Sequence, residues 1–423
     1  MSQLETASRS VIEAHQLARL QHGLTRILPQ NRFYREKLLQ KSDSIVIEQL
    51  ENLSSLPFTT KRELVTDQEE YPLFGSNLTH PLSEYVRFHQ TSGTSGRPLK
   101  IVDTQESWDW WANCWTSVYR AAGVSRDDIV FLAFGFGPFI GFWSAYEGAK
   151  RLGALTVTGG GMDSLQRLRM IQEIGATVLV CTPSYALRLA EVAHEHNIDL
   201  TESSIRVTIH AGEPGASIPA TCERIEQAWG ASTYDHAGMT EVGAFGFACS
   251  QQQGIHVNEG EFIAETLDVQ NGQPVQKGQV GELVLTNLGR WGSPVIRYRT
   301  GDLVQHGGFS CACGRSFLML PGGVLGRADD MLIVRGVNVY PSALANILHR
   351  FPEVTEYRVI VTKNGSLDEI ALEVECPSEL VTTLQEELHL ALHLRVPVEA
   401  VELGTLPRFE LKARRVDDRR SPG

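Results

Sequence analysis

Short apolar runs alternate with amphipathic stretches between Tyr85 and about Val257. The apolar runs are rich in β-branched and aromatic residues, most of them end in Gly, Pro or Ser, and they occupy residues 128–137, 154–160, 176–184 and 205–214. Apolar residues recur with helical spacing between them, in residues 107–123, 164–175 and 184–197. This alternation predicts a largely parallel sheet flanked by helices, with ligand-binding loops at the carboxyl ends of the strands.

The two ends of the chain follow other patterns. Residues 1–60 predict helices joined by loops, and Thr59-Thr60 is suited to cap a helix that begins near Lys61. From Gly260 to about Leu320 the helical spacing fades and antiparallel strands are expected. The remainder predicts a compact α+β module of helices and strands. We therefore expect an α/β protein with a large domain over residues 1–326, including a β-rich subdomain, and a small α+β domain over residues 330–423.

Composition narrows the function classes. A chain of 423 residues exceeds what one hydrophobic core normally serves. The net charge of −12 argues against a nucleic-acid groove as the main function. The chain has no apolar run of membrane-spanning length and no apolar segment typical of a signal peptide at its polar N-terminus. Seven scattered cysteines suit a reducing compartment better than a disulfide framework, so a cytoplasmic location is expected.

The stretch HQTSGTSGRPLK, residues 89–100, carries the first chemical signal. Its small residues allow backbone N–H groups to approach phosphate oxygens, and its hydroxyls and cations can add further bonds. A solvated turn is the simpler explanation for such a loop taken alone. The loop also lacks the Gly-Lys-Ser/Thr ending of the common nucleotide-binding loop.

Four further motifs follow in order: AGMTEVG at 237–243, YRTGDLV at 298–304, GRADDMLIVRGVNVYP at 326–341 and LPRFELKARRV at 406–416. Together with the glycine loop, this ordered set resembles the adenylate-forming (acyl-CoA synthetase) superfamily. LPFTTKREL, AFGFGPFIGFW, CACGRS and the C-terminal motif narrow the resemblance to the phenylacetate–CoA ligase family. The resemblance covers the chain from about residue 25 to its end.

The resemblance implies a role for each matching residue. It implies that the ATP phosphates are wrapped by Thr91, Ser92, Gly93, Thr94, Ser95 and Gly96. It implies that nucleotide binding also involves Gly212, Glu213, Pro214, Asp235, Asp302 and Arg327. Thr240 would contact the α-phosphate, Glu241 would hold Mg²⁺ and Lys412 would be the catalytic lysine. Asp329 would be the hinge on which the small domain moves.

The chain departs from the family pattern at three positions. Arg97 replaces the lysine that usually follows the glycine loop, and Leu411 replaces the glycine before the catalytic lysine. Ala237 occupies the place of an aromatic residue that stacks on adenine, for which Tyr234 or Phe245 could substitute. Taken alone, each acidic motif residue could be a turn or cap residue, and Lys412 could belong to a solvated basic tail.

A glycine-spaced aromatic run, residues 131–148, follows a predicted strand. Core packing accounts for part of it, but the same pattern can build a flat apolar slot for a substrate. The resemblance places the acyl pocket here, with the candidate lining residues Phe136, Phe139, Ile140, Ala211, Gly238 and Met239. The run has no cation before Lys150, which favours an aryl or arylalkyl acid over a dicarboxylate.

Cys249, His256, Cys311 and Cys313 lie in the turn-rich region after the predicted main sheet. Three thiolates and one imidazole suit a tetrahedral structural Zn²⁺ site. The Cys-x-Cys and Cys-x6-His spacings are not the common ones, and four unrelated residues remain the alternative.

These features predict an ATP-dependent acid–CoA ligase that forms an acyl-adenylate and then a thioester. Its partners would be a small carboxylic acid, ATP, Mg²⁺ and coenzyme A, with no nucleic acid and no membrane, in a monomer or homodimer. One alternative is an adenylating enzyme that passes the acyl group to a carrier protein or AMP to another small molecule. A non-catalytic nucleotide-binding regulator is a third hypothesis, against which the presence of both Glu241 and Lys412 argues.

Overall fold

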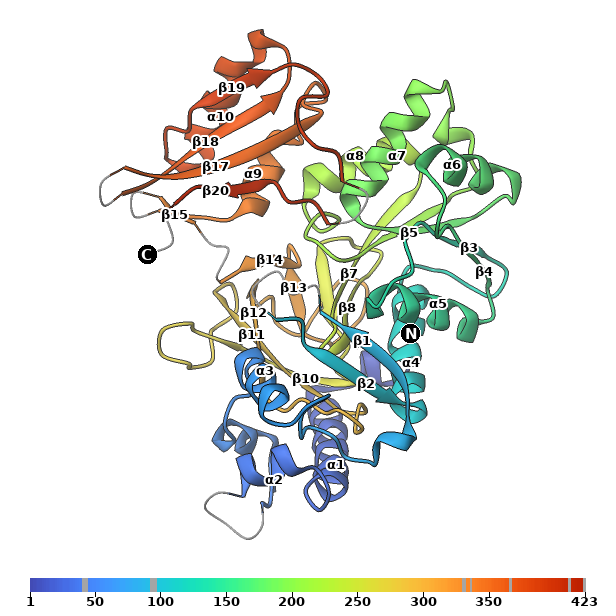
Figure 1. Cartoon of the computed structure of the whole chain (residues 1–423), viewed down its shortest axis with the longest axis vertical. Coiled ribbons are helices and arrows are strands. Elements are labelled where there is room, and N and C mark those ends of the chain that lie inside the picture. Colours follow the sequence, from blue (N-terminus) through green and yellow to red (C-terminus); the bar gives the residue numbers. More distant parts are fainter. Residues whose placement is uncertain are drawn as a thin grey trace.

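The computed structural model of the chain describes residues 1–39, 45–91, 97–328, 332–334, 337–364, 367–409 and 412–420. Figure 1 shows a large body that contains the N-terminal and central parts of the chain, and a smaller C-terminal unit that lies beside α8. No helix within the described ranges is long and apolar enough to cross a membrane.

The main sheet has the strand order β13-β9-β8-β7-β6-β5-β3-β4 in the described part of the chain. Neighbouring strands from β7 to β4 are parallel, whereas β8, β9 and β13 extend the sheet antiparallel. The bounds are β3 Ile129–Leu132, β4 Leu155–Thr158, β5 Val178–Cys181, β6 Val207–His210, β7 Ser232–Met239, β8 Gly243–Ala248, β9 Gly254–Val257 and β13 Met319–Pro321.

Helices cover both faces of this sheet. After β3 the chain moves outward to β4 and then returns across β3 to β5, β6 and β7. Because parallel crossovers are right-handed, this reversal places the helix after β3 on one face and the next three helices on the other. The helices are α4 Gln105–Ala121, α5 Ile140–Leu152, α6 Ser164–Glu173, α7 Pro183–Glu195 and α8 Pro219–Trp229. In Figure 1, α6, α7 and α8 lie together, and α4 lies beside α5.

The N-terminal helices are α1 Arg9–Ile27, α2 Arg32–Leu38 and α3 Lys61–Glu70. Apolar residues of α1 and α2 pack with Trp291 and Ile296 in a separate cluster. The predicted cap of α3 is confirmed, since the Thr60 side chain accepts a hydrogen bond from the Glu63 amide and the Glu63 carboxylate accepts one from the Thr60 amide. Short 3₁₀ helices occur at Leu4–Thr6, Leu50–Ser55, Leu82–Glu84, Leu200–Glu202 and Ser378–Leu380.

Two further sheets complete the large body. An antiparallel hairpin pairs β1 Tyr85–Gln90 with β2 Lys100–Thr104. An antiparallel sheet has the order β10-β11-β12-β14, with bounds β10 Phe262–Leu267, β11 Val280–Asn287, β12 Tyr298–Gln305 and β14 Val324–Arg327. The expected antiparallel region after Gly260 is therefore confirmed.

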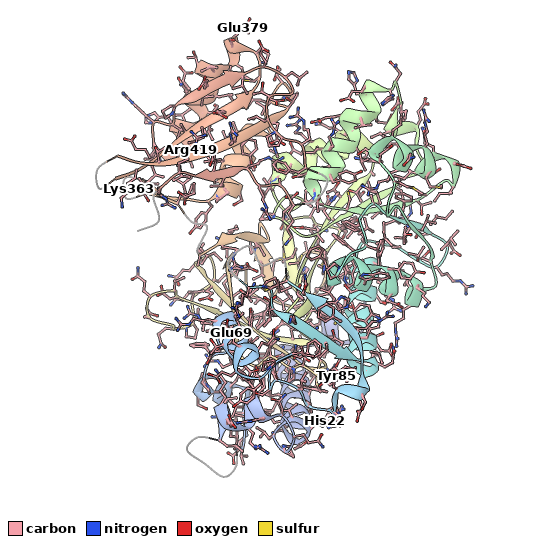
Figure 2. All side chains as sticks on the ribbon, in the orientation of Figure 1. His22, Glu69, Tyr85, Lys363, Glu379 and Arg419 are labelled. Carbon is pink, nitrogen blue, oxygen red and sulfur yellow. The ribbon has the colours of Figure 1, made fainter. Side chains whose placement is uncertain are left out.

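The C-terminal unit has its own sheet, β19-β18-β17-β20, and an apolar cluster that also includes Ile218 of the large body. Its elements are β15 Leu332–Val334, β16 Val337–Val339, α9 Pro341–Leu348, β17 Glu356–Asn364, β18 Leu367–Glu375, α10 Val381–Leu392, β19 Val398–Val401 and β20 Val416–Asp418. Figure 2 shows Lys363, Glu379 and Arg419 on this unit and His22, Glu69 and Tyr85 on the large body. The expected α/β fold class is confirmed.

Candidate active site

The carboxyl ends of β3, β5, β6 and β7 lie at one edge of the main sheet. The strand order reverses between β3 and β5, and such a reversal opens a crevice where ligands bind in α/β sheets. The loops that leave these strands carry the aromatic run, the 211–214 turn and the Thr240-Glu241 turn. The fold thus brings three of the sequence motifs to one edge.

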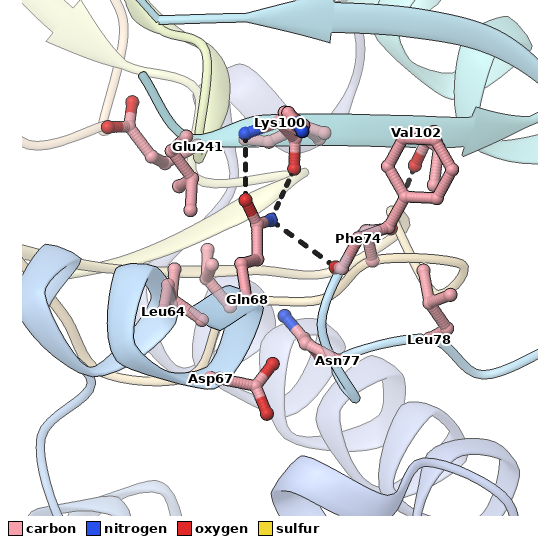
Figure 3. A pocket seen from close by; sticks show the side chains of 13 residues that line it. Leu64, Asp67, Gln68, Phe74, Asn77, Leu78, Lys100, Val102 and Glu241 are labelled. Carbon is pink, nitrogen blue, oxygen red and sulfur yellow. Dashed lines mark hydrogen bonds between the residues drawn. The ribbon is translucent and has the colours of Figure 1, made fainter. Parts of the chain in front are cut away.

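The β1–β2 hairpin holds both ends of the glycine loop. Thr91 is buried, its amide donates to the Leu99 carbonyl at 3.0 Å, and its hydroxyl accepts from the Leu99 amide at 2.9 Å. Gln68 of α3 bonds the backbone of Lys100, accepting from its amide at 3.0 Å and donating to its carbonyl (Figure 3). The remaining predicted phosphate-binding residues, Ser92 to Gly96, lie outside the described residues, as does the predicted hinge Asp329.

A buried ion pair supports the turn that carries Thr240 and Glu241. Arg290 donates to the Thr240 carbonyl at 2.7 Å and the Glu241 carbonyl at 3.2 Å. Its other donors reach both carboxylate oxygens of Asp103, at 2.7 and 2.6 Å, and both side chains of this pair are 0% exposed. Arg290 and Asp103 were not predicted from the sequence, because a single Arg or Asp in an unremarkable stretch carries no local signal of burial.

The Glu241 carboxylate is 5% exposed and faces Lys61, whose Nζ lies 3.4 Å from Oε1. Tyr298 also adjoins it, and burial followed by the charge of Glu241 raises the pKa of that phenol well above its ordinary value. Lys61 lies in the LPFTTKREL motif. The motif was recognised from the sequence, but the ion pair of Lys61 with Glu241 was not predicted. The site therefore contains a further cation, beyond Arg327 and Lys412, that was not predicted from the sequence.

A small cavity of about 30 Å³ lies behind Glu241, between α3 and β2 (Figure 3). Leu64, Phe74 and Val102 are among the side chains that line it, together with polar groups of Asp67 and Asn77. A volume of this size accommodates about one water molecule. The cavity is therefore too small to be the acid pocket.

Asp302 and Arg327 face each other across β12 and β14. Arg327 Nη1 lies 3.7 Å from Asp302 Oδ1 and donates to the Thr300 carbonyl at 3.3 Å. Asp302 is 9% exposed, and its amide donates to the Thr300 hydroxyl at 3.0 Å. The antiparallel register thus brings together two residues that the sequence analysis had assigned to the same nucleotide.

The small unit brings Lys412 to the turn that follows β6. A side chain at Gly212 would meet the Lys412 stem, because its Cβ would lie 3.4 Å from Lys412 Cε, and Gly212 has φ +99°. The Glu213 carboxylate accepts hydrogen bonds from the Ser184 amide at 2.9 Å and the Ala413 amide at 2.6 Å. Glu213 therefore ties the Lys412 segment to the large body, while Pro214 beside it is exposed.

The Lys412 residue keeps solvent access. Its crowding by protein nevertheless lowers the pKa of the ammonium, while the carboxylates of Glu213, Asp302 and Glu241 oppose that shift. Arg327 lowers the pKa further. Lys412 thus lies within electrostatic range of three carboxylates from separate motifs, which favours the predicted site over a solvated tail; its catalytic role stays a prediction.

Asp235 is 8% exposed, and burial raises the pKa of its carboxyl group to about 6. Its backbone pairs with His210 on the adjacent strand β6.

Two aromatic residues were considered for adenine stacking in place of the residue at Ala237. Phe245 is 1% exposed within the main core and is therefore excluded. Tyr234 is only half-buried.

The expected acid-binding residues fall into two groups. Phe136 is half-buried and packs edge-on against Trp143 at 4.8 Å between ring centroids, and Phe139 is 37% exposed, so both are at the surface of the crevice edge. Ile140 is 3% exposed and packs in the core at the start of α5. Ala211 follows β6, Gly238 and Met239 are the last two residues of β7, and each retains exposure.

The structure brings Cys249, His256, Cys311 and Cys313 together. Their ligand atoms all lie within 4.8 Å of one another. The Cys249 and Cys311 sulfurs are 3.8 Å apart, and the Cys313 sulfur is 3.6 Å from His256 Nε2. The other ring nitrogen of His256 lies 3.3 Å from the Phe317 carbonyl. The alternative of four unrelated residues is therefore wrong.

Known proteins match both units of the chain. The AMP-binding enzyme family matches residues 28–289, and the AMP-binding enzyme C-terminal domain matches residues 336–420. The chain belongs to the AMP-binding enzyme family. The phenylacetate-coenzyme A ligase of Pseudomonas putida is 32% identical over 435 residues, which cover 99% of this chain and 96% of that protein. The Escherichia coli K12 phenylacetate-coenzyme A ligase is 32% identical over 447 residues, 99% of this chain and 97% of that one.

These matches confirm membership in the phenylacetate–CoA ligase family of acid–thiol ligases. Among solved structures, 2-hydroxyisobutyryl-CoA ligase in the postadenylation state with 2-HIB-AMP has a TM-score of 0.92 at 30% identity, covering 98% of this chain and 91% of that one. The same ligase with 2-HIB-AMP and CoA in the thioesterification state has a TM-score of 0.75 at 31% identity. That match covers 99% of this chain and 92% of the ligase chain. At nearly equal identity, the postadenylation structure is the more similar in shape.

Proposed function

We propose that this protein joins a carboxylic acid to coenzyme A through an acyl-adenylate. The observation that carries the proposal is the position of Lys412, which stands beside Gly212 and in the electrostatic range of Glu241 and Asp302. A cation among motif carboxylates suits a transition state in which negative charge develops on transferring phosphate oxygens. The family membership of the chain supports the same reaction.

In the first step, a carboxylate oxygen of the acid attacks the α-phosphorus of ATP. A new P–O bond forms, the bond to the β-phosphate oxygen breaks, and pyrophosphate leaves. Lys412 stabilises the charge that develops on the phosphate oxygens, and Thr240 donates to the α-phosphate from the turn that Arg290 braces. Thr91 holds the base of the glycine loop, and Asp302 with Arg327 binds the ribose.

A magnesium ion would neutralise phosphate charge in this site when bound. Glu241 is the residue that would hold it, since its buried carboxylate is a hard oxygen ligand at the motif turn. Lys61 lies 3.4 Å from the same carboxylate and supplies the compensating charge in the structure. We infer that Lys61 adds positive charge at the place where the phosphates would bind.

In the second step, the CoA sulfur attacks the acyl carbonyl carbon of the adenylate. A C–S bond forms, the bond to the phosphate oxygen breaks, AMP leaves, and the thiol proton passes to solvent. Lys412 has no part in this step. We propose that the small domain, residues 330–423, turns about Asp329 on the large domain, residues 1–326, to remove Lys412 and admit the thiol.

The two solved states of 2-hydroxyisobutyryl-CoA ligase support this alternation. The chain resembles the postadenylation state with a TM-score of 0.92 and the thioesterification state with one of 0.75. We infer that the present arrangement is the one used for adenylation. The contacts between Glu213 and Ala413 stabilise it.

We propose an aryl or arylalkyl acid as the substrate. Phe136 and Phe139 lie at the crevice edge, with the small residues Ala211 and Gly238 at the neighbouring strand ends. The names of the relatives, phenylacetate-coenzyme A ligases, support an arylacetic acid. Apolar walls of this kind bind a ring through the area they remove from water.

The test is a panel of aromatic acids incubated with ATP, Mg²⁺ and CoA. AMP formation and the mass of the thioester should appear together for at least one acid. Pyrophosphate release without CoA consumption would instead favour the alternatives, a carrier-protein acceptor or transfer of AMP to another small molecule. Absence of acid-dependent pyrophosphate release would contradict the enzyme hypothesis and leave a nucleotide-binding regulator.

We also propose a structural Zn²⁺ at Cys249, His256, Cys311 and Cys313. A tetrahedral zinc with Zn–S near 2.3 Å and Zn–N near 2.0–2.1 Å separates two sulfurs by about 3.8 Å and a sulfur from a nitrogen by about 3.6 Å. The corresponding separations in the structure are 3.8 and 3.6 Å. The Phe317 carbonyl beside His256 Nδ1 is the kind of second contact that orients a ligating imidazole.

The zinc would join the β8–β9 hairpin to the loop before β13, away from the reacting atoms. Its role there would be to cross-link the fold, and it would take no part in catalysis. Metal analysis of protein purified without added zinc should give about one zinc per chain. A chain that is fully folded and contains no zinc would contradict the proposal.

A further inference from the structure

His236 stands two residues before Gly238 on β7, so the two residues face the same side of the sheet. The imidazole packs on Trp115 of α4, with ring centroids 4.2 Å apart. The adjacent helix α5 begins at Ile140, directly after the aromatic loop. His236 therefore lies on the helix-covered face that continues into the proposed acid pocket.

The hydrogen bonds of His236 define its tautomer. Its Nδ1 lies 2.7 Å from the Gly246 carbonyl, and a carbonyl only accepts, so Nδ1 carries the proton and donates. Burial lowers the pKa of His236 to about 4, and the ring is neutral at neutral pH. Nε2 is consequently a lone-pair acceptor held in a fixed direction.

Nε2 of His236 has no hydrogen-bond partner among the described residues. Unlike the ring nitrogens of His89, it is not fully enclosed by protein. A Cβ at Gly238 would lie 3.1 Å from it, and Gly238 is exposed. The missing side chain at Gly238 thus leaves Nε2 open toward the crevice. An aromatic or aliphatic substrate ring alone could not satisfy this acceptor.

Two other buried histidines show that this arrangement is specific. His210 on the adjacent strand β6 uses both ring nitrogens, with Nδ1 3.2 Å from the Cys181 carbonyl and Nε2 2.9 Å from the Thr208 hydroxyl. Both ring nitrogens of His89 are enclosed and have no hydrogen-bond partner among the described residues. Only His236 of these three combines a fixed tautomer with an acceptor next to an exposed glycine.

We propose that His236 selects an acid that carries a hydrogen-bond donor, a hydroxyl or amino group, on the part of the substrate that lies over Gly238. This inference rests on the proposed function and names the substrate class of the same site. An acid without the donor would leave Nε2 desolvated and unpaired, which disfavours its transition state.

The test compares phenylacetates and benzoates that bear hydroxyl or fluorine at the same ring position. Fluorine has a similar size but cannot donate a hydrogen bond. AMP formation with ATP and CoA gives kcat/KM for each acid, and at one ring position the hydroxyl acid should exceed its fluoro counterpart by about tenfold, the value of one neutral hydrogen bond. In His236→Leu this ratio should fall toward one, and His236→Gln, which retains an acceptor, should restore part of it.

The outcomes separate this inference from the function on which it rests. If every acid fails to give AMP, the proposed function and this inference are both wrong. If AMP forms but the wild-type protein shows no hydroxyl preference at any position, only this inference is wrong, and that result needs no folded variant. An unchanged preference in folded His236→Leu would also overturn it.

Discussion

The Lys412 site and the Cys/His cluster are both assembled from distant parts of the sequence, but they are held in different ways. The Cys/His cluster lies within the large body, where β13 pairs with β9 and the register places Met319 opposite His256. Lys412 reaches its site from another unit, through contacts such as Glu213 with the Ala413 amide and Arg415 with the Ser184 hydroxyl. One site is built into a sheet and the other depends on docking.

The interface contacts are of a kind that can break and re-form. Arg408 lies 3.3 Å from Glu191, Thr221 and His349 share a hydrogen bond at 2.7 Å, and Arg224 donates to the Val354 carbonyl. Polar contacts between domains permit relative motion, although Ile218 of the large body also packs in the apolar cluster of the small unit. In the proposed mechanism, the residue needed in only one step is therefore the one held by contacts between the two units.

The largest effect is expected for Arg290→Met, which tests the contacts built into the large body. The change leaves Asp103 charged and unpaired in the core, which typically lowers the free energy of unfolding by about 3–5 kcal/mol. Denaturant unfolding would measure the effect. Arg206→Met is the matched control, because its ion pair with Asp128 includes an arginine that is 48% exposed and should contribute at most about 1 kcal/mol. Equal losses in the two variants would contradict this reading.

Lys412→Ala tests the site that depends on docking of the small unit. Adenylate formation should fall about 10²–10³-fold, or roughly 2.7–4 kcal/mol, because one positioned donor to the transition-state charge is lost. Single-turnover pyrophosphate release would measure it. The same variant, supplied with acyl-adenylate and CoA, should form thioester at nearly the wild-type rate.

Arg414→Ala is the matched control for that experiment, since Arg414 is an exposed cation two residues away. It should change neither half-reaction appreciably. A Lys412 variant that is impaired equally in both half-reactions would argue for one fixed arrangement of the two units.

Cys311→Ser should destabilise the large body by roughly 1–3 kcal/mol, because one ligand of the proposed zinc site is lost. Thermal unfolding and metal content should decrease together, while kcat of the folded fraction changes little. Cys376→Ser in the small unit is the control, since Cys376 is not part of the cluster. Loss of activity without loss of stability would indicate a role other than structural.

The smallest expected effect belongs to Glu191→Gln at the interface. Loss of the partly exposed contact with Arg408 should weaken docking by about 0.2–1 kcal/mol. The ratio of adenylation to thioesterification rates should therefore fall by less than about fivefold, a range that follows from the same energy. Glu195→Gln, which removes only a contact with Arg188 within α7, should leave the ratio unchanged.

The sequence by itself determined the local features of this protein. Apolar periodicity and Gly/Pro boundaries identified the parallel strands, and the Thr60–Glu63 cap was readable because it depends on residues three apart. The ordered motifs identified the family. Cysteine and histidine identity predicted that Cys249, His256, Cys311 and Cys313 would lie together, because soft ligands are rare enough to stand out; the zinc itself stays a prediction.

Only the tertiary structure decided which residues meet. Arg290 braces the Thr240-Glu241 turn from a strand connection about fifty residues away, and nothing near Arg290 in the sequence distinguishes it from a surface arginine. Packing between elements far apart in the chain places Lys61 beside Glu241 and Lys412 beside Gly212. The same packing buries Phe245 in the core. Periodicity reports which face of an element is buried, but the partner on that face depends on strand order and domain docking, which are long-range properties.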